Sequence, residues 1–126
     1  MIKLIFSFTF IFWTVQVLAS DIVSLEEKLK TAKDSARGVI LNELCLMYQI
    51  RDPVKALEYG FEGIRLAENL HLQQLAGHLY KSVGVTYIYQ SDHPEVARYL
   101  LKSLQIFQQL NDKSGEAQAI FSMASM

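Results

Sequence analysis

Three histidines, a single cysteine and scattered carboxylates are the side chains of this 126-residue chain that could do chemistry. His71 and His78 are seven residues apart, which on one helix places them on the same face but roughly 10 Å apart along the axis. That separation is too large for both to bind one metal ion. His93 precedes Pro94 in a turn and has no second ligand near it in sequence. We therefore expect neither a metal ion nor a cofactor.

Nothing in the sequence indicates a nucleophile with its base. Cys45 lies in an apolar helical pattern, where burial is a more natural role than reactivity. Glu58 and Glu62 fall on a helix face that is expected to be exposed to solvent. Gly60 and Gly63 lie inside a helical pattern and do not form a phosphate-binding loop after a strand. The chain is therefore predicted not to be an enzyme.

The first residues have the features of a secretory signal peptide. Lys3 supplies a positive start, an apolar run extends from Leu4 to Trp13, and Val17 and Ala19 occupy the small-residue positions before a cleavage site. About fifteen apolar residues fall short of the roughly 20 that span a bilayer as a helix. We expect residues 1–19 to be a signal peptide, with an uncleaved anchor as the alternative, and residues 20–126 to form the domain.

Charge and cysteine usage restrict the kinds of partner and of fold. The whole chain has a formal charge of −1, and removal of Lys3 with the leader makes it more negative still. Nucleic-acid binding would require a basic excess, so it is not expected. With one cysteine there is no intrachain disulfide, and stability must come from packing.

The chain also resembles itself at a shift of 40 positions. The matching pairs are Asp52/Asp92, Tyr59/Tyr99, Ile64/Leu104, Leu66/Ile106 and Leu70/Leu110. A period of this size on helical patterning is typical of stacked helical hairpins, in which each unit buries its apolar face on the next. Such an array presents a surface for binding other molecules.

Helix starts can be placed from capping residues. Asp52 followed by Pro53 is a strong start signal, and we expect Asp34, Asp92 and Asp112 to begin the other helices. The pattern predicts helices of about 15 to 18 residues, joined by short connections that make successive helices antiparallel. The predicted fold is all-α, a right-handed stack of two and a half to three hairpins.

Two further predictions concern packing within the stack. Ser24 and Glu27 have the spacing of a capping box at the start of a leading helix. Gly60 and Gly63 each cost a helix about 1 kcal/mol relative to alanine. We expect the close approach of a neighbouring backbone to compensate for that cost.

Three segments of the sequence carry a family resemblance. Residues 83–87, 91–92, 96–99 and 103–104 resemble the tetratricopeptide repeat, residues 52–59 and 64–68 are similar to its second helix in a preceding unit, and residues 111–117 resemble the linker to a further first helix. The resemblance covers about residues 35–126. The 40-residue period is longer than the usual 34, as in the extended repeats of bacterial sensory proteins, and Leu44 and Gly63 depart from the family's pattern.

The resemblance implies a groove lined by the first helix of each unit. The positions that match are Leu41, Cys45, Tyr48 and Gln49 in the first unit, His78, Lys81, Val85, Ile88 and Tyr89 in the second, and Gln118 and Phe121 in the third. Of these, Tyr89 and Lys81 are the expected central pair, because an amphipathic ring supplies contact area and an ammonium can meet a carboxylate.

The implied function is a non-catalytic scaffold that binds a peptide or protein segment. A second hypothesis makes the chain the sensory N-terminal part of a membrane-bound histidine kinase or nucleotide cyclase, since such exported modules often precede these domains. Both place the chain outside the cytoplasm, in the periplasm or anchored to the inner membrane. A third hypothesis is a homodimer through the final helix, because Ile120, Phe121 and Met123 have no following helix to cover them. Truncation of a longer protein would explain the same open edge.

Overall fold

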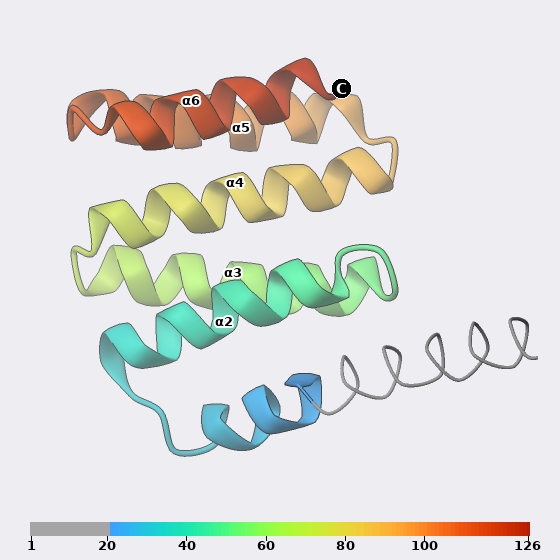
Figure 1. The fold of residues 1–126 in the computed structure, drawn as a ribbon, viewed down its shortest axis with the longest axis vertical. Helices are drawn as coiled ribbons and strands as arrows, with labels where there is room; N and C mark the ends of the chain where they lie inside the picture. The colour runs from blue at the N-terminus through green and yellow to red at the C-terminus, as the bar shows by residue number, and fades with distance from the viewer. Residues whose placement is uncertain (1–20) are drawn as a thin grey trace, which may run out of the picture.

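A computed structural model describes residues 21–126 of the chain (Figure 1). Its helices are α2 (Asp34–Tyr48), α3 (Pro53–Asn69), α4 (Gln73–Tyr89), α5 (His93–Gln109) and α6 (Lys113–Ala124), and residues 21–29 are helical as well. Residues 21–126 contain no strand. The prediction of an all-α fold is confirmed.

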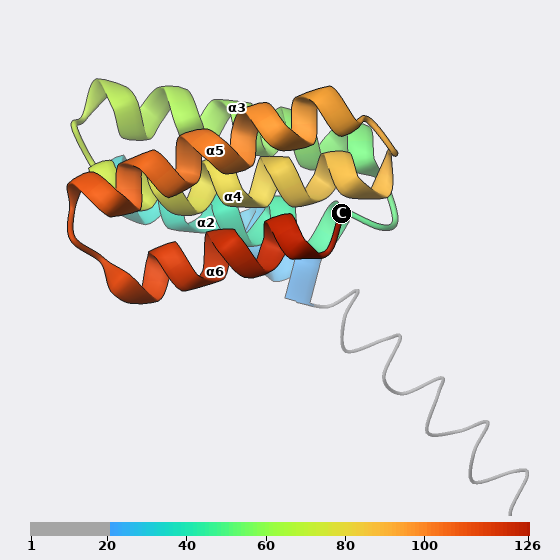
Figure 2. The ribbon, with the colours of Figure 1, turned by 90° about the horizontal axis from the view of Figure 1, so that it is seen from above.

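Successive helices pack side by side and run in opposite directions (Figure 1). Contacts also join α2 to α4 and α4 to α6, whereas the backbones of α3 and α5 do not meet. Seen from above, α3 and α5 lie toward one face, and α2, α4 and α6 lie toward the other (Figure 2). The stack therefore has two different faces, and on the face that carries α3 and α5 these two helices are not in backbone contact.

Three of the turns share one geometry and recur every 20 residues. His71, Ser91 and Asn111 follow the ends of α3, α4 and α5, and each has a φ of 56°. In the first of these turns the Leu72 amide donates to the Ala67 carbonyl at 2.8 Å, and the same bond closes the other two. This is a Schellman motif, which satisfies carbonyls that a helix end leaves free. Identical turns after helices of identical length keep the hairpins in register.

The capping predictions are confirmed in part. The carboxylates of Asp52 and Asp112 accept from the Lys55 and Gly115 amides at 3.1 and 3.0 Å. Asp92 occupies the N-cap of α5 but makes no side-chain cap bond. The prediction for Asp34 was wrong, because Lys33 is the N-cap of α2 and lacks an acceptor, while Asp34 is the first helical residue.

Two other local predictions need correction. Ser24 lies inside the helical stretch 21–29 and cannot be its cap. At Gly60 and Gly63 the close neighbours are side chains and not a backbone: a Cβ would meet Val83 Cγ2 at 2.5 Å and Leu79 Cδ2 at 2.6 Å. The glycines therefore make room for the apolar side chains of α4, which reach across to α3.

A continuous apolar core runs along the stack. Leu41, Leu79, Val83, Leu100 and Phe107 are fully buried and come from α2, α4 and α5. The few polar side chains inside this core have partners, since Ser103 donates to the Gly77 carbonyl at 2.8 Å, as buried hydroxyls normally do. Burial across successive hairpins is the main source of stability expected for a repeat array.

The predicted signal peptide, residues 1–19, lies outside the described residues. Within residues 21–126, no helix has both the length and the apolar character that a bilayer crossing requires.

Candidate functional site

A shallow depression between α4 and α6 brings together three of the predicted groove residues. Lys81 projects from α4, while Gln118 and Phe121 come from α6 on the other side. The depression has a volume of about 470 Å³ and opens widely to solvent. Phe121 leaves 75% of its surface exposed, and its neighbour Ile120 leaves 54% exposed. An aromatic ring thus stands free beside a polar pair.

Lys81 is the one charged side chain among the residues that line this depression, and His78 lies one turn before it on α4. The Lys81 ammonium donates to the Gln118 side-chain carbonyl. Burial lowers the pKa of Lys81, which indicates that its ammonium is partly removed from water. Burial also lowers the pKa of His78, and the nearby Lys81 charge adds to that effect. His78 packs edge-on against Phe107, with ring centroids 4.9 Å apart, so its ring serves the core.

The predicted central pair is not brought together in one hollow. Tyr89 is exposed at the end of α4, eight residues and roughly 12 Å along the helix axis from Lys81. It does not line the depression beside Lys81. Val85 and Ile88 lie half-buried on the same helix.

Two of the predicted first-unit residues belong to the core. Leu41 and Cys45 are fully buried, so their assignment to a groove was wrong. The Cys45 side chain lies against Gly60, and its sulfur is 3.8 Å from the Thr86 hydroxyl. Burial raises the pKa of the Cys45 thiol to about 11, as expected for an unreactive packing cysteine.

The other two predicted groove residues of the first unit are Tyr48 and Gln49. The Tyr48 hydroxyl donates to the Glu26 carboxylate at 2.6 Å, and Tyr59 donates to the same oxygen at 3.2 Å. Lys55 pairs with Glu26 at 3.3 Å and lies over the Tyr48 ring. These contacts attach the helical residues 21–29 to α2 and α3. Gln49 is half-buried at the end of α2.

A metal centre finds no support in residues 21–126. No group of three or more histidine, cysteine or acidic side chains there is arranged to hold an ion.

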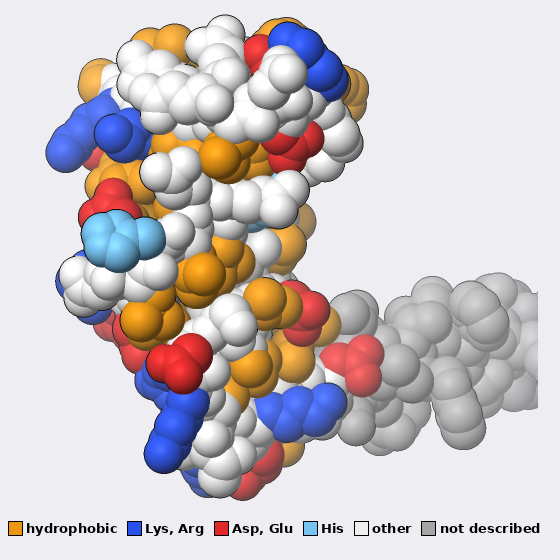
Figure 3. Space-filling model, turned by 90° about the vertical axis from the view of Figure 1, so that its left-hand side faces the viewer, with side chains coloured by type: hydrophobic (Ala, Val, Ile, Leu, Met, Phe, Trp, Pro, Cys, Tyr) orange, Lys and Arg blue, Asp and Glu red, His pale blue; other side chains and the backbone are white. Residues whose placement is uncertain are grey.

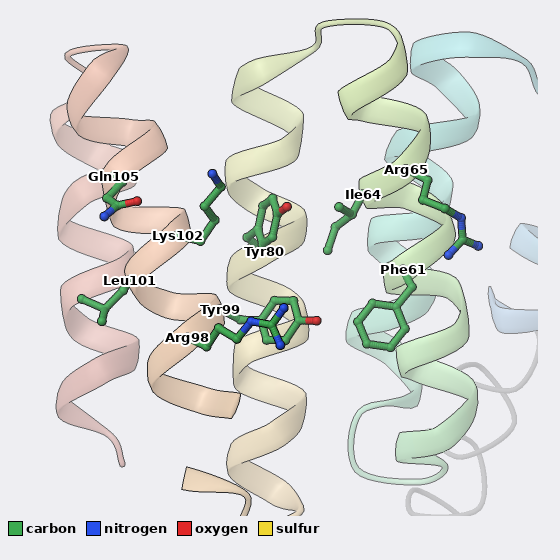
Figure 4. A pocket seen from close by; sticks show the side chains of 9 residues that line it. All are labelled: Phe61, Ile64, Arg65, Tyr80, Arg98, Tyr99, Leu101, Lys102 and Gln105. Atoms are coloured by element: carbon green, nitrogen blue, oxygen red, sulfur yellow. The ribbon is translucent and has the colours of Figure 1, made fainter. Parts of the chain in front are cut away.

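A second hollow, which the sequence did not predict, occupies the gap between α3 and α5. It has a volume of about 420 Å³. Apolar and aromatic side chains from three helices line it together with cationic ones, among them Phe61, Ile64, Tyr80, Arg98, Tyr99 and Lys102. Figure 4 shows Phe61, Ile64 and Tyr99 converging from α3 and α5 in front of α4. The recurrence of Tyr59 as Tyr99 in the repeat was the one available signal, but it does not reveal whether the ring lines a hollow.

A third depression lies where the helices end, near the α3–α4 turn. Val39, Leu72 and Leu110 contribute apolar surface to it beside His71. Figure 3 looks onto this side of the molecule and shows apolar side chains reaching the surface between charged ones. Glutamines also line this depression, and the residues that line it include no cluster of charged side chains that could select a ligand.

Comparison of the chain with protein-family models, with curated proteins and with solved structures finds no match.

Proposed function

We propose that this chain is a non-catalytic interaction module that binds a peptide or protein segment on the face formed by α2, α4 and α6. The observation that carries the proposal is the exposed Phe121 ring, which stands beside the Lys81–Gln118 pair in the depression between α4 and α6.

The chemistry of this depression suits recognition of a peptide. An exposed aromatic side chain supplies contact area at a low entropic cost, and aromatic residues are frequent among the side chains that dominate binding energy. The adjacent ammonium and amide can exchange their mutual hydrogen bond for bonds to a peptide carboxylate or carbonyl. Apolar contact combined with a few polar groups is the usual composition of a peptide-binding groove.

We further infer that the hairpins form a right-handed solenoid of the tetratricopeptide type, with about two and a half to three repeats. The identical turns at 20-residue intervals support this inference. So does the placement of α2, α4 and α6 toward one face, where such a repeat presents its binding side chains (Figure 2). Export to the periplasm through the N-terminal segment is part of the same proposal, and cell fractionation with N-terminal sequencing of the mature protein tests it.

Selection of peptides on the purified chain tests the function. Random dodecapeptides displayed on phage are enriched on the immobilised protein, and the enriched peptides are measured by fluorescence anisotropy. Phe121→Ser is expected to weaken binding by about thirtyfold if the ring is a hot spot. Gln118→Ala should weaken it by severalfold, as loss of one hydrogen bond does.

The matched control is Val54→Ser, since Val54 is 63% exposed in the first turn of α3. It should leave binding unchanged. Enriched peptides that bind the Phe121→Ser variant as tightly as the wild type would reject the assignment of this face.

The sensory hypothesis remains a second prediction. The coding sequence immediately downstream of this chain tests it, because a membrane helix followed by a kinase or cyclase domain in the same gene would make the module part of a receptor.

A further inference from the structure

We propose a second binding site, for an acidic peptide segment, in the hollow between α3 and α5 on the face opposite the α4–α6 depression. This site is independent of the proposed function, because none of the side chains that line it lines the α4–α6 depression.

The walls of the hollow combine an aromatic floor with positive charge. Tyr80 and Tyr99 stack with ring centroids 5.9 Å apart, and Phe61 lies 6.0 Å from Tyr99. Figure 4 shows Lys102 extending from α5 beside α4, and Arg98 lying over Tyr99. A ligand placed here would meet apolar rings below and cations at the rim.

The charges around the hollow are not balanced within it. No carboxylate is among the residues that line the 420 Å³ hollow, which include Arg65 as well as Arg98 and Lys102. Glu95, in the first turn of α5, forms an ion pair with Arg98 in which the charged atoms are 3.5 Å apart. The Arg98 side chain is nevertheless 71% exposed. Lys102 makes no ion pair within 4.0 Å in residues 21–126. The charge complementary to this site is therefore negative.

The chain itself shows how the equivalent place in the preceding hairpin is used. Tyr59, which is the repeat equivalent of Tyr99, binds the carboxylate of Glu26, and Tyr48 and Lys55 bind the same carboxylate. That carboxylate is presented by the helical residues 21–29, which lie beside the hairpin. Around Tyr99 the nearby carboxylates have other partners, since Glu68 accepts from Tyr80 and Glu95 pairs with Arg98. The Tyr99 hydroxyl itself makes no hydrogen bond to a carboxylate within residues 21–126. We infer that a binding partner supplies one.

The shape of the hollow favours a peptide over a small ion. A second depression of about 230 Å³ lies toward the ends of α3 and α5. Lys102 lines both hollows, and Glu68 is the one carboxylate among the residues that line the second. Together they extend along α3 from Phe61 to His71, which is roughly 15 Å at the rise of an α-helix. That length fits about four or five residues of extended chain. The proposed occupant is therefore a short segment that alternates acidic and apolar side chains.

The probe is a synthetic octapeptide of alternating leucine and glutamate, titrated into the ¹⁵N-labelled chain and followed by amide chemical shifts. The expected result is saturable shifts centred on residues 61–71 and 98–106 and including Tyr80, which forms part of the floor. The double variant R98E/K102E should bind at least about tenfold more weakly, because each exposed ion pair contributes about twofold to fivefold and reversal adds repulsion. The matched control R51E/K28E changes the same charge on exposed side chains that do not line the hollow.

Two further peptides test separately whether the negative charge and the apolar side chains of the ligand are required. A leucine–lysine octapeptide should not bind, and a serine–glutamate octapeptide should bind much more weakly than the leucine–glutamate one. The proposal would be overturned if either of these peptides bound as tightly as the leucine–glutamate peptide, or if the control variant weakened binding as much as R98E/K102E. Shifts centred on α4 and α6, or no shifts at millimolar peptide, would overturn it as well. Circular dichroism of both double variants verifies that they are folded.

Discussion

Replacement of Gly84 by alanine sets two well-defined effects against each other. In an open helix this change stabilises by about 1 kcal/mol, because alanine has the higher helix propensity. In this stack a Cβ at position 84 would lie 2.7 and 2.9 Å from Leu100 Cδ2 and Cγ, and 3.3 Å from the Leu100 backbone nitrogen. Leu100 is fully buried, so it has no free space into which it can turn.

The packing effect should prevail at Gly84. Overfilling a tight core costs about 1 to 3 kcal/mol, and two contacts below 3.0 Å place this site in the upper half of that range. After subtraction of the propensity gain, we expect Gly84→Ala to lower the free energy of unfolding by about 1 to 2 kcal/mol, and Gly84→Val to lower it further.

Urea unfolding followed by far-ultraviolet circular dichroism measures this change. Ala36→Gly, at an exposed position of α2, calibrates the propensity effect alone and should cost about 1 kcal/mol. If Gly84→Ala instead stabilises the chain by the amount that Ala36→Gly destabilises it, then α4 and α5 do not pack as closely as described, and the reasoning fails.

Three other predictions concern single side chains. The Cys45 thiol should react with iodoacetamide at about pH 8 far more slowly in the native chain than in urea, because its raised pKa and burial leave little accessible thiolate; equal rates would contradict its place in the core. The hydrogen bond from Tyr48 lowers the pKa of Glu26 below its ordinary value of 4.5, so this carboxylate should stabilise the fold above about pH 4.5 and lose that contribution as the pH falls through the lowered pKa. Glu26→Gln should therefore destabilise the chain near neutral pH and differ less from the wild type in acid, and a constant difference would contradict this. Phe121→Glu should leave the melting temperature within a few degrees of the wild-type value, because the ring is largely exposed, and in analytical ultracentrifugation it should abolish any self-association through α6.

Features fixed by local chemistry were predictable from the sequence. Asp52 before Pro53 has a capping acceptor and a helix-starting φ next to one another, and α3 begins there as expected. The 40-residue recurrence likewise indicated stacked hairpins, because helical periodicity depends on the chain alone. Asp34 is not the cap because it already lies in α2, and the N-cap position before it is occupied by Lys33, which has no side-chain acceptor.

Features that depend on how helices face one another were not predictable. Leu41 and Cys45 were assigned to a groove, yet Cys45 lies against α3 and near Thr86 of α4, and a helix enclosed from two sides has little free surface on its inner faces. The hollow around Tyr99 was missed for the opposite reason. Its opening depends on the separation of α3 and α5, which no pattern within either helix encodes.

The candidate binding site contains features of both kinds, some predictable from local sequence and some dependent on helix packing. Phe121 was expected to lie exposed at the edge of the stack, and it does. Lys81 and Gln118, however, are 37 positions apart, and their hydrogen bond follows from the packing of α6 on its neighbours. Tyr89 was favoured as the partner of Lys81 by its chemistry, although the helix carries it two turns away.

We propose that partners bind on the face that carries α4 and α6. The most direct measurement replaces Phe121 with the photocrosslinker p-benzoylphenylalanine and irradiates the chain in the presence of a peptide enriched on the wild-type protein. A covalent adduct is expected, and excess competing peptide added before irradiation should suppress its formation. Little adduct is expected when the same crosslinker replaces Val54. Adducts of equal yield from both positions, or from position 54 alone, would contradict the proposal.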